Sequence, residues 1–301
     1  MRSLQIKAHA KLNAALSVGP PADDGMHPIC SWMLTIDLHD EMTLTALEPD
    51  RLSRYAIMWH DDALQRRDID WPITSDLAVR AHQLIERHVG RTLPVQMKLE
   101  KRIPIGGGLG GGSSDAAAML RGLNELFELS ISHETLETLA AELGSDVPFL
   151  VRGGSSIVEG TGDRIESMGT IPDLNAVLIL PEIGCETASV YRRLDDMHPT
   201  PVDSDAVRSL ITRGFQSQQL FNDLAEPALE VGNGLRALWE EVAALTESPV
   251  HVSGSGSTLF IICDDAATAT TLSARITSSM GLATIPVSVV EQRDGILSSP
   301  S

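Results

Sequence analysis

The stretch "KRIPIGGGLGGGSSDAAAML", residues 101–120, joins an expected strand to an expected helix through a glycine-rich segment. Six of the seven residues at 106–112 are glycines, and two serines follow them. Glycine reaches positive φ freely and carries no Cβ that would keep a ligand away from the backbone. Several N–H groups can therefore converge on an anion, and the first turn of a helix adds partial positive charge. The stretch predicts a phosphate cradle built from the main chain.

Other glycine-rich motifs fit this stretch poorly. A Walker A loop needs a lysine after its last glycine, where this chain has Ser113. Gly106, Gly108 and Gly111 satisfy the Rossmann pattern G-x-G-x-x-G, but the acidic residue expected about 20 positions later would fall at the start of a helix. The H-R-D and D-F-G motifs of protein kinases are absent. A flexible linker is disfavoured, because loops between periodic elements are seldom pure spacers and a helix follows at once.

Upstream of the cradle, the pattern predicts strands and one helix. Residues 4–8 alternate between polar and apolar side chains, as in a half-buried strand. Residues 31–47 are interpreted as two short strands around an acidic turn at 40–41. Residues 75–90 place apolar side chains on one helical face and end in glycine. Residues 95–100 alternate again, so a strand is expected to run directly into the cradle.

Downstream of the cradle, two helices are expected. Residues 115–129 have strong helix propensity, with Ser114 or Asp115 placed as the N-cap. Residues 136–143 carry apolar side chains at helical spacing, and Gly144 is the expected C-cap. The cradle therefore lies between a strand and a pair of helices.

A change of composition near residue 165 predicts a domain boundary, with domains at 1–165 and 166–301. Before it, residues 145–154 are expected to be extended, because Pro148 disfavours helix at the preceding residue. Beyond it we expect a strand at 176–180, helices near 205–212, 220–231 and 235–245, a strand, glycine turn and strand over 249–265, a helix at 266–279 and a strand at 284–290. Strands and helices mix without regular β-α-β alternation, so both domains are predicted to be α+β.

The composition is that of a folded and acidic protein. The chain has 301 residues, more than one core usually holds, with 43% hydrophobic and 21% charged residues. Its 23 basic and 41 acidic residues give a formal net charge of −18. Such a chain repels nucleic acid and anionic membranes. A phosphate-bearing ligand would need backbone N–H groups, a few placed cations or a metal.

Cysteine use and the N-terminal sequence favour a cytoplasmic protein. The chain has three cysteines and no C-x-x-C pair, which argues against a disulfide framework and fits a reducing compartment. The first residues alternate between polar and apolar types and contain no long apolar run. We therefore expect neither a signal peptide nor a membrane anchor.

Seven segments, in order along the chain, resemble motifs of the GHMP kinase superfamily, and most closely those of the 4-diphosphocytidyl-2-C-methyl-D-erythritol kinases. The cradle, "PIGGGLGGGSSDAA" at 104–117, resembles the ATP-binding motif. The other segments are "AKLN" at 10–13, "DGMH" at 24–27, "LGSDVPFLVRGG" at 143–154, "EGTGD" at 159–163, "FNDLAEP" at 221–227 and "SGSGSTLF" at 253–260. They span most of the chain, so the resemblance is specific.

The resemblance implies a two-domain α+β fold. The N-terminal domain would be like domain 2 of ribosomal protein S5, and the C-terminal domain would be ferredoxin-like. It also implies an enzyme that uses ATP and Mg²⁺ to phosphorylate the 2-hydroxyl of 4-diphosphocytidyl-2-C-methyl-D-erythritol, in non-mevalonate isoprenoid biosynthesis. The partner is then a small molecule, not nucleic acid or a membrane, and the protein is expected to be a monomer or a homodimer.

Two charged residues are the candidate catalytic pair. Asp146 precedes an apolar run, where a plain turn residue is the alternative interpretation. Lys11 lies among the apolar residues of an alternating strand, where an exposed lysine on an edge strand is the alternative. The resemblance places the family's catalytic aspartate at Asp146, as the base for the hydroxyl proton. It places the catalytic lysine at Lys11, which is expected to pair with Asp146 and favour ionisation of the substrate hydroxyl.

The residues expected to hold ATP run through the cradle without a gap. They are Pro104, Ile105, Gly106, Gly107, Gly108, Leu109, Gly110, Gly111, Gly112, Ser113 and Ser114. One of the two serines is expected to contact phosphate or metal, and the sequence does not choose between them. No dedicated metal cluster is visible in the sequence, so the ligands of Mg²⁺ stay open. The "SGSGS" at 253–257 resembles a plain hairpin turn, but the family resemblance implies that it packs near the cradle.

The substrate residues follow from the strand pattern and the resemblance. Asn13 faces the same side of its strand as Lys11, and the resemblance implies that it contacts substrate. The family's Gly-Tyr-His element, which stacks on cytosine and hydrogen-bonds it, corresponds here to a stretch with Met26 in place of tyrosine and with His27 kept. Methionine is a weaker platform than an aromatic ring, so either the cytosine site is looser or the substrate differs. A second stacking aromatic corresponds to Tyr191, which by itself would pass for an ordinary helix-face residue.

Two other functions stay open on the sequence. Another small-molecule GHMP kinase, acting on a mevalonate- or homoserine-like alcohol, is compatible with Met26. A non-catalytic nucleotide-binding protein on the same scaffold is disfavoured by the presence of both Lys11 and Asp146.

Overall fold

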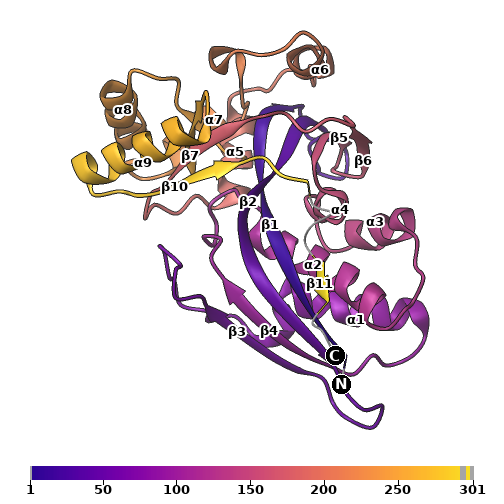
Figure 1. The fold of residues 1–301 in the computed structure, drawn as a ribbon. Coiled ribbons are helices and arrows are strands. Elements are labelled where there is room, and N and C mark those ends of the chain that lie inside the picture. Colours follow the sequence, from indigo (N-terminus) through magenta and orange to yellow (C-terminus); the bar gives the residue numbers. More distant parts are fainter. Residues whose placement is uncertain (1, 292–295, 299–301) are drawn as a thin grey trace.

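Two β-sheets form the frame of the protein, as a computed structural model describing residues 2–291 and 296–298 shows (Figure 1). The larger sheet has seven strands in the order β11-β1-β2-β4-β3, with β5 paired to β2 and β6 to β5. Its pairs are antiparallel, except that β3 and β4 run parallel. Its strands are β1 (Ser3–Val18), β2 (Ile29–Ala46), β3 (Arg54–Trp59), β4 (Val95–Lys101), β5 (Ser155–Gly160), β6 (Arg164–Ser167) and β11 (Ile296–Ser298).

The smaller sheet has four antiparallel strands in the order β10-β7-β9-β8. They are β7 (Asn175–Leu180), β8 (His251–Val252), β9 (Leu259–Cys263) and β10 (Ala283–Ser288). The small sheet thus begins beyond the predicted boundary near residue 165, whereas β11 pairs back onto β1 of the large sheet. The division into two domains stays a prediction.

Helices cover the outer faces of both sheets (Figure 1). Those on the large sheet are α1 (Leu77–Val89), α2 (Gly111–Leu126), α3 (His133–Ala141) and α4 (Val147–Arg152). The later helices are α5 (Thr187–Asp196), α6 (Ser204–Thr212), α7 (Ala225–Val231), α8 (Leu235–Thr246) and α9 (Ala266–Met280), with short 3₁₀ turns η1 (Ile73–Ser75) and η2 (Ser217–Gln219). Across residues 2–291 and 296–298, no helix is both long and apolar enough to span a bilayer.

The apolar cores lie between these layers. One core fills the space between the large sheet and helices α1–α4. A second core lies between the two sheets, and a third lies between the small sheet and the later helices. Strand β7 contributes to both, since Ala176 and Leu178 belong to the second core and Val177 and Ile179 belong to the third. This alternation is the period of a strand buried on both faces. The order of layers is helices, sheet, sheet, helices.

Most of the predicted elements are present with small shifts in their bounds. Helix α1 has Asp76 as its N-cap and Gly90, in the left-handed conformation, as its C-cap. The helix expected over 220–231 is shorter, because Asn222 forms a β-bridge with Leu16 and α7 begins only at Ala225. Strand β3, helix α5 and the β5–β6 hairpin were not predicted as elements.

The predicted acidic turn at 40–41 is wrong, because β2 runs through it as one strand. Asp40 is completely buried, and its carboxylate accepts hydrogen bonds from the ammonium of Lys101 and from the N–H groups of Arg102 and Ile103. A buried charge that is paired and hydrogen-bonded is tolerated. The strand therefore has no need to leave the sheet at this acidic residue.

The predicted return to extended structure at 145–154 is also wrong, because most of it forms α4. Pro148 lies at the start of this helix, where its missing N–H would have no partner in any case. Val147, Phe149 and Leu150 are fully buried against the helical layer. Burial of this apolar run outweighs the local preference that proline imposes.

Two predicted helix caps are wrong as well. Helix α2 begins at Gly111 with Gly110 as its N-cap, so Ser114 and Asp115 lie inside the helix. The C-cap of α3 is Glu142, not Gly144. The start of α2 within the glycine run has a functional consequence, since it brings the helix N-terminus to the cradle itself.

Candidate active site

A cavity of about 490 Å³ lies where β1, the glycine-rich segment and α5 meet. This volume falls within the range of about 300–1,000 Å³ that is typical of small-molecule sites. The predicted residues that line it are Lys11, Asn13, Asp146, Tyr191 and residues 104–113, whereas Ser114 and His27 are not part of the lining. One cavity thus gathers residues from distant parts of the chain.

The glycine loop, residues 104–110, has carbonyls turned toward the protein. The carbonyls of residues 107–109 accept hydrogen bonds, in order, from the N–H of Thr258 at 3.3 Å, the hydroxyl of Ser253 at 3.1 Å and the N–H of Lys11 at 3.0 Å. Because these carbonyls already accept hydrogen bonds from the protein, this part of the loop can bind an anion through its N–H groups. The predicted packing of residues 253–257 against the cradle is present.

Gly108 shows why the loop needs glycine. Its φ is +73°, a conformation that L side chains rarely adopt. A Cβ at this position would stand 2.2 Å from the carbonyl oxygen of Ser253. Both the backbone conformation and the close approach of residues 253–257 therefore exclude a side chain.

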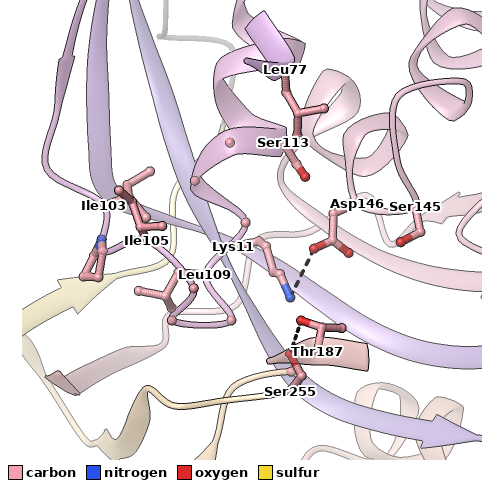
Figure 2. Close-up of a pocket in the computed structure, with 18 of the residues that line it drawn as sticks. Lys11, Leu77, Ile103, Ile105, Leu109, Ser113, Ser145, Asp146, Thr187 and Ser255 are labelled. Atoms are coloured by element: carbon pink, nitrogen blue, oxygen red, sulfur yellow. Dashed lines mark hydrogen bonds and ion pairs between the residues drawn. The ribbon is translucent and has the colours of Figure 1, made fainter. Parts of the chain in front are cut away.

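Helix α2 points its N-terminus at the cavity, and it separates the two candidate serines. The N–H of Ser114 is the first in the helix to bond a carbonyl of the preceding turn, that of Gly110 at 2.8 Å, so the N–H groups of residues 111–113 stay outside the helical ladder. The Ser114 hydroxyl is buried and donates to the carbonyl of His9 at 2.6 Å. The Ser113 hydroxyl points toward the space beside Asp146 (Figure 2). Of the two serines, Ser113 is therefore the one whose hydroxyl is directed at the cavity, and the phosphate or metal contact itself stays a prediction.

Lys11 and Asn13 lie between two irregularities of β1. The pairing with β2 shifts register between His9 and Lys11 and again between Asn13 and Ala15. Such bulges redirect side chains and are frequent beside active sites. Here Lys11 and Asn13 line the cavity, while Leu12 between them is part of an apolar core.

Lys11 and Asp146 form an ion pair inside the cavity, with Nζ and Oδ2 3.4 Å apart (Figure 2). The lysine side chain is 5% exposed and the aspartate 27%. Asp146 is the N-cap residue of α4, but its carboxylate makes no capping hydrogen bond. The carboxylate therefore stays directed at the lysine and open to a ligand, and the predicted contact between the two residues is present.

Asn13 is held in a fixed orientation beside Lys11. Its amide oxygen accepts a hydrogen bond from the Lys11 ammonium. Its amide nitrogen donates to the Ser31 hydroxyl at 2.8 Å, which in turn donates to the carbonyl of Ala15 at 2.8 Å. This chain of hydrogen bonds orients the amide, and the amide fixes the ammonium.

Tyr191 and His27 pack together at the α5 side of the cavity. Their ring centroids are 4.9 Å apart at an interplanar angle of 50°. His27 bonds the carbonyl of Gly19 through Nδ1 at 2.9 Å and lies 3.4 Å from a carboxylate oxygen of Asp195 through Nε2. Burial, with the Asp146 carboxylate nearby, raises the pKa of Tyr191 to about 12, so its phenol stays neutral. Tyr191 faces the cavity, while His27 supports it from behind.

Three further charged residues, two of them lining the cavity and one behind it, were not identified from the sequence. Lys101 donates to Asp40 at 2.6 Å and also to Asp115, and all three side chains are almost completely buried. Burial lowers the pKa of Lys101, but Asp115 and Asp40 outweigh burial and hold it above its ordinary value. The sequence did contain a hint of these residues in the alternation of the strands. Lys101 occupies a buried position in the alternation of β4, and Asp40 occupies one in that of β2. A charge at a core-facing position implies a buried partner.

Comparison with known proteins identifies the family. The model of the family described as "GHMP kinases N terminal domain" matches residues 76–154. The 4-diphosphocytidyl-2-C-methyl-D-erythritol kinase of Bacillus subtilis is 38% identical over 86% of this chain and 88% of its own length. The chain belongs to the 4-diphosphocytidyl-2-C-methyl-D-erythritol kinase family of GHMP kinases. The Paenarthrobacter aurescens kinase of the same name is 33% identical over 92% of this chain and 90% of its own.

A solved structure supports membership of this kinase family at the level of the fold. The crystal structure of a 4-(cytidine 5'-diphospho)-2C-methyl-D-erythritol kinase superposes with a TM-score of 0.76 and 28% identity, over 95% of this chain and 98% of that one. The predicted α+β kinase fold and the family resemblance are confirmed. As a member of this family, the chain is an ATP-dependent small-molecule kinase.

Proposed function

We propose that this protein transfers the γ-phosphoryl group of ATP to the 2-hydroxyl of 4-diphosphocytidyl-2-C-methyl-D-erythritol. The observation that carries the proposal is the Lys11–Asp146 ion pair, which stands beside the glycine loop in one cavity. Kinase chemistry on a hydroxyl needs phosphate positioning, charge neutralisation and a place for the proton. The shared name of the relatives supplies the identity of the alcohol.

The glycine loop and the first turn of α2 hold the triphosphate in this proposal. The loop carbonyls bond to the protein, which leaves N–H groups for the phosphate oxygens. The chain carries a net charge of −18, so phosphate binding depends on these local donors and on Lys11. Ser113 adds a hydroxyl at the same end of the cavity.

Asp146 and Lys11 divide the work at the reacting hydroxyl. As the 2-hydroxyl oxygen bonds to the γ-phosphorus, its proton passes to the Asp146 carboxylate and the bond to the β–γ bridging oxygen breaks, releasing ADP. Lys11 favours ionisation of the hydroxyl and stays oriented by Asn13. The transfer is direct and in line, without a phosphoenzyme.

Mg²⁺ is the metal that the proposal includes. Among residues 2–291 and 296–298, no group of three or more histidine, cysteine, aspartate or glutamate side chains could hold an ion alone. Mg²⁺ does not need such a group, because it keeps several waters and is bound through one or two protein oxygens and the nucleotide phosphates. Ser113 is the candidate protein ligand, because its hydroxyl points into the part of the cavity beside the Lys11–Asp146 pair (Figure 2). When bound, Mg²⁺ neutralises charge on the phosphates.

Tyr191 is the platform for cytosine in this proposal. Its ring lines the cavity and is held by His27 behind it. Met26, in place of a second aromatic, has an exposed fraction of 49% and adds little fixed surface. One base–aromatic stack contributes about 1–3 kcal/mol, so the cytidylyl group binds through Tyr191 with a looser second side.

The cellular setting belongs to the same proposal. All three cysteines are buried and free, which supports a reducing, cytoplasmic location. The working form is a monomer or a homodimer.

A substrate panel tests the function. Purified protein is given ATP, Mg²⁺ and one alcohol at a time: the cytidylyl substrate, mevalonate or homoserine, with ADP formation and ³¹P NMR of the product as readouts. We expect turnover with the cytidylyl substrate and a new phosphomonoester at its 2-position. Faster turnover with mevalonate or homoserine would show that the proposed substrate is wrong. If no alcohol gave ADP, the protein would be a non-catalytic nucleotide-binding protein.

A further inference from the structure

Asp40, Lys101 and Asp115, here called the buried cluster, join three different elements. Asp40 belongs to β2, Lys101 ends β4 and Asp115 lies in α2. Their exposed fractions are 0%, 3% and 2%. The ammonium of Lys101 donates to one carboxylate oxygen of Asp40 and one of Asp115. One cation therefore connects two strands to a helix.

The buried cluster holds the glycine loop at both ends. Before the loop, the second carboxylate oxygen of Asp40 accepts the N–H groups of Arg102 and Ile103, the latter at 2.7 Å. After the loop, Asp115 lies in the helix whose N-terminus the loop forms. The loop itself is mostly glycine, so it has few side chains with which to fix its own shape. Its shape depends on how its ends are held.

Stability alone does not account for such a cluster. Desolvation of buried ion pairs often cancels their attraction, and apolar side chains of similar volume are frequently at least as stable. Here one cation faces two carboxylates, and burial raises the pKa of Asp115 well above its ordinary value although Lys101 opposes the shift. What the charges add is a geometry that apolar contacts would not specify.

We propose that the buried cluster positions the glycine loop, setting the spacing at which its N–H groups meet the triphosphate. The inference rests on the proposed function, since it assigns positioning residues to that same ATP site. These residues act through the loop and do not touch the reacting atoms. The second oxygen of Asp115 has no hydrogen-bond partner in the described parts of the chain, and Asp115 borders the cavity. Direct contact with the nucleobase is therefore the competing explanation.

Asp40→Asn is the primary variant, because Asp40 uses both oxygens. An asparagine has one oxygen, so it loses either the Lys101 bond or the two N–H bonds. The matched control is Glu137→Gln, which disturbs a two-bond contact with Arg152, at 2.8 and 2.7 Å, away from the cavity. A third protein, Asp40→Leu/Lys101→Met/Asp115→Leu, replaces all three charges with apolar groups.

The measurement is calorimetric binding of adenosine and of the non-hydrolysable ATP analogue AMPPNP with Mg²⁺, alongside the thermal midpoint. For Asp40→Asn we expect the Kd of AMPPNP to rise about tenfold or more, while that of adenosine changes less than about threefold. Glu137→Gln should bind both as the unaltered protein does. The triple variant should recover thermal stability but not AMPPNP affinity, and it gives the test if Asp40→Asn fails to fold.

Equal losses of adenosine and AMPPNP would overturn the proposal in favour of a nucleobase contact. Unaltered AMPPNP affinity in a folded triple variant would reduce the cluster to a stabilising role. The proposed function fails separately: if AMPPNP binds as expected but no alcohol is phosphorylated, loop positioning still stands. If the unaltered protein binds no AMPPNP, both proposals fall together.

Discussion

Lys11 and Lys101 both lie beside the glycine loop, yet their surroundings differ. Lys101 sits between two carboxylates with side-chain exposures of 0% and 2%, and Lys11 faces the Asp146 carboxylate, which is 27% exposed. Both lysines border the cavity and are almost completely buried, but the two partners of Lys101 are buried with it, whereas the partner of Lys11 is partly exposed. The same residue type thus serves two regions: a closed region, in which the partner carboxylates are buried, and an open region, in which the partner carboxylate is partly exposed.

The comparison shows that the exposure of a charged group determines whether the group can fix the structure or take part in chemistry. In the closed region, the Lys101 ammonium bonds to both buried carboxylates, so the three charges hold one another in place. In the open region, the Asp146 carboxylate pairs with Lys11 and has room for a ligand. A group that must accept a proton belongs in the open region, and groups that must not move belong in the closed one.

The largest expected effect is on turnover in the open region. Asp146→Asn keeps the shape of the side chain but removes the base, so kcat should fall by about 10²–10⁴-fold with little change in ATP affinity. The measurement is steady-state kinetics with the cytidylyl substrate. The control is Asp203→Asn, which alters an aspartate that caps α6 and should leave kcat unchanged. Full activity in Asp146→Asn would remove it from the role of base.

The next effect is on stability and should separate the two lysines. Lys101→Met leaves two buried carboxylates without a cation, so the free energy of unfolding should fall by about 3–5 kcal/mol. Lys11→Met leaves Asp146 partly hydrated and should cost less than about 1 kcal/mol in urea unfolding, while turnover collapses. Similar stability losses in both variants would erase the distinction between closed and open regions.

A smaller effect tests the loop that lies between the two regions. Gly106→Ala and Gly108→Ala both place a Cβ at positive φ, +72° and +73°, which costs about 1–2 kcal/mol. Among residues 2–291 and 296–298, atoms lie close to the Cβ placed at Gly108, but none lies within 4 Å of the Cβ placed at Gly106. Gly108→Ala should therefore lower the free energy of unfolding by about 1–3 kcal/mol more than Gly106→Ala, which is the usual penalty of overpacking. Equal thermal midpoints of the two variants would mean that residues 253–257 shift to admit the new methyl group without a loss of stability.

The smallest effect is a response to acid at His9, on strand β1. His9, whose carbonyl holds Ser114, has its pKa lowered to about 4 by burial and by His39, while an unfolded histidine titrates near about 6.5. The unfolded chain therefore binds this proton more strongly, so the stabilisation is complete above about pH 6.5 and is lost as the pH falls toward 4. Between pH 7 and 5 the contribution should fall by about 2 kcal/mol.

His9→Gln provides the comparison for that acid response. Urea unfolding of both proteins at each pH gives the difference in the free energy of unfolding. That difference should narrow by about 2 kcal/mol on acidification, because glutamine does not titrate. A constant gap between the two proteins would show that the His9 proton is not linked to folding.

The candidate site was predictable where its signal was local. Glycine spacing identified the cradle, and the lysine within an apolar strand identified Lys11. Asp146 needed the family resemblance, because an aspartate before an apolar run has many structural uses. The serine that faces the cavity was not predictable, since Ser113 and Ser114 are neighbours and only the start of α2 at Gly111 decides which one turns inward.

The fold was predictable where periodicity was strong and failed where long-range contacts overrode it. Residues 40–41 resemble a turn, yet β2 continues because Lys101 satisfies Asp40 from a neighbouring strand. The residues around Pro148 resemble an extended segment, yet they form α4 because its apolar side chains are buried against other helices. Local preference is weak compared with burial of several large side chains.

The sequence by itself determined the bare backbone of the cradle, the alternation of the strands around it and the types of charge available, because these depend on residues close together in the chain. Only the tertiary structure decided which charges meet. Lys101 finds one partner 61 residues away and another 14 residues away, and Lys11 meets a carboxylate supplied by a distant helix. Whether a charge is enclosed or open to a ligand depends on what packs around it, and that is a property of the folded chain.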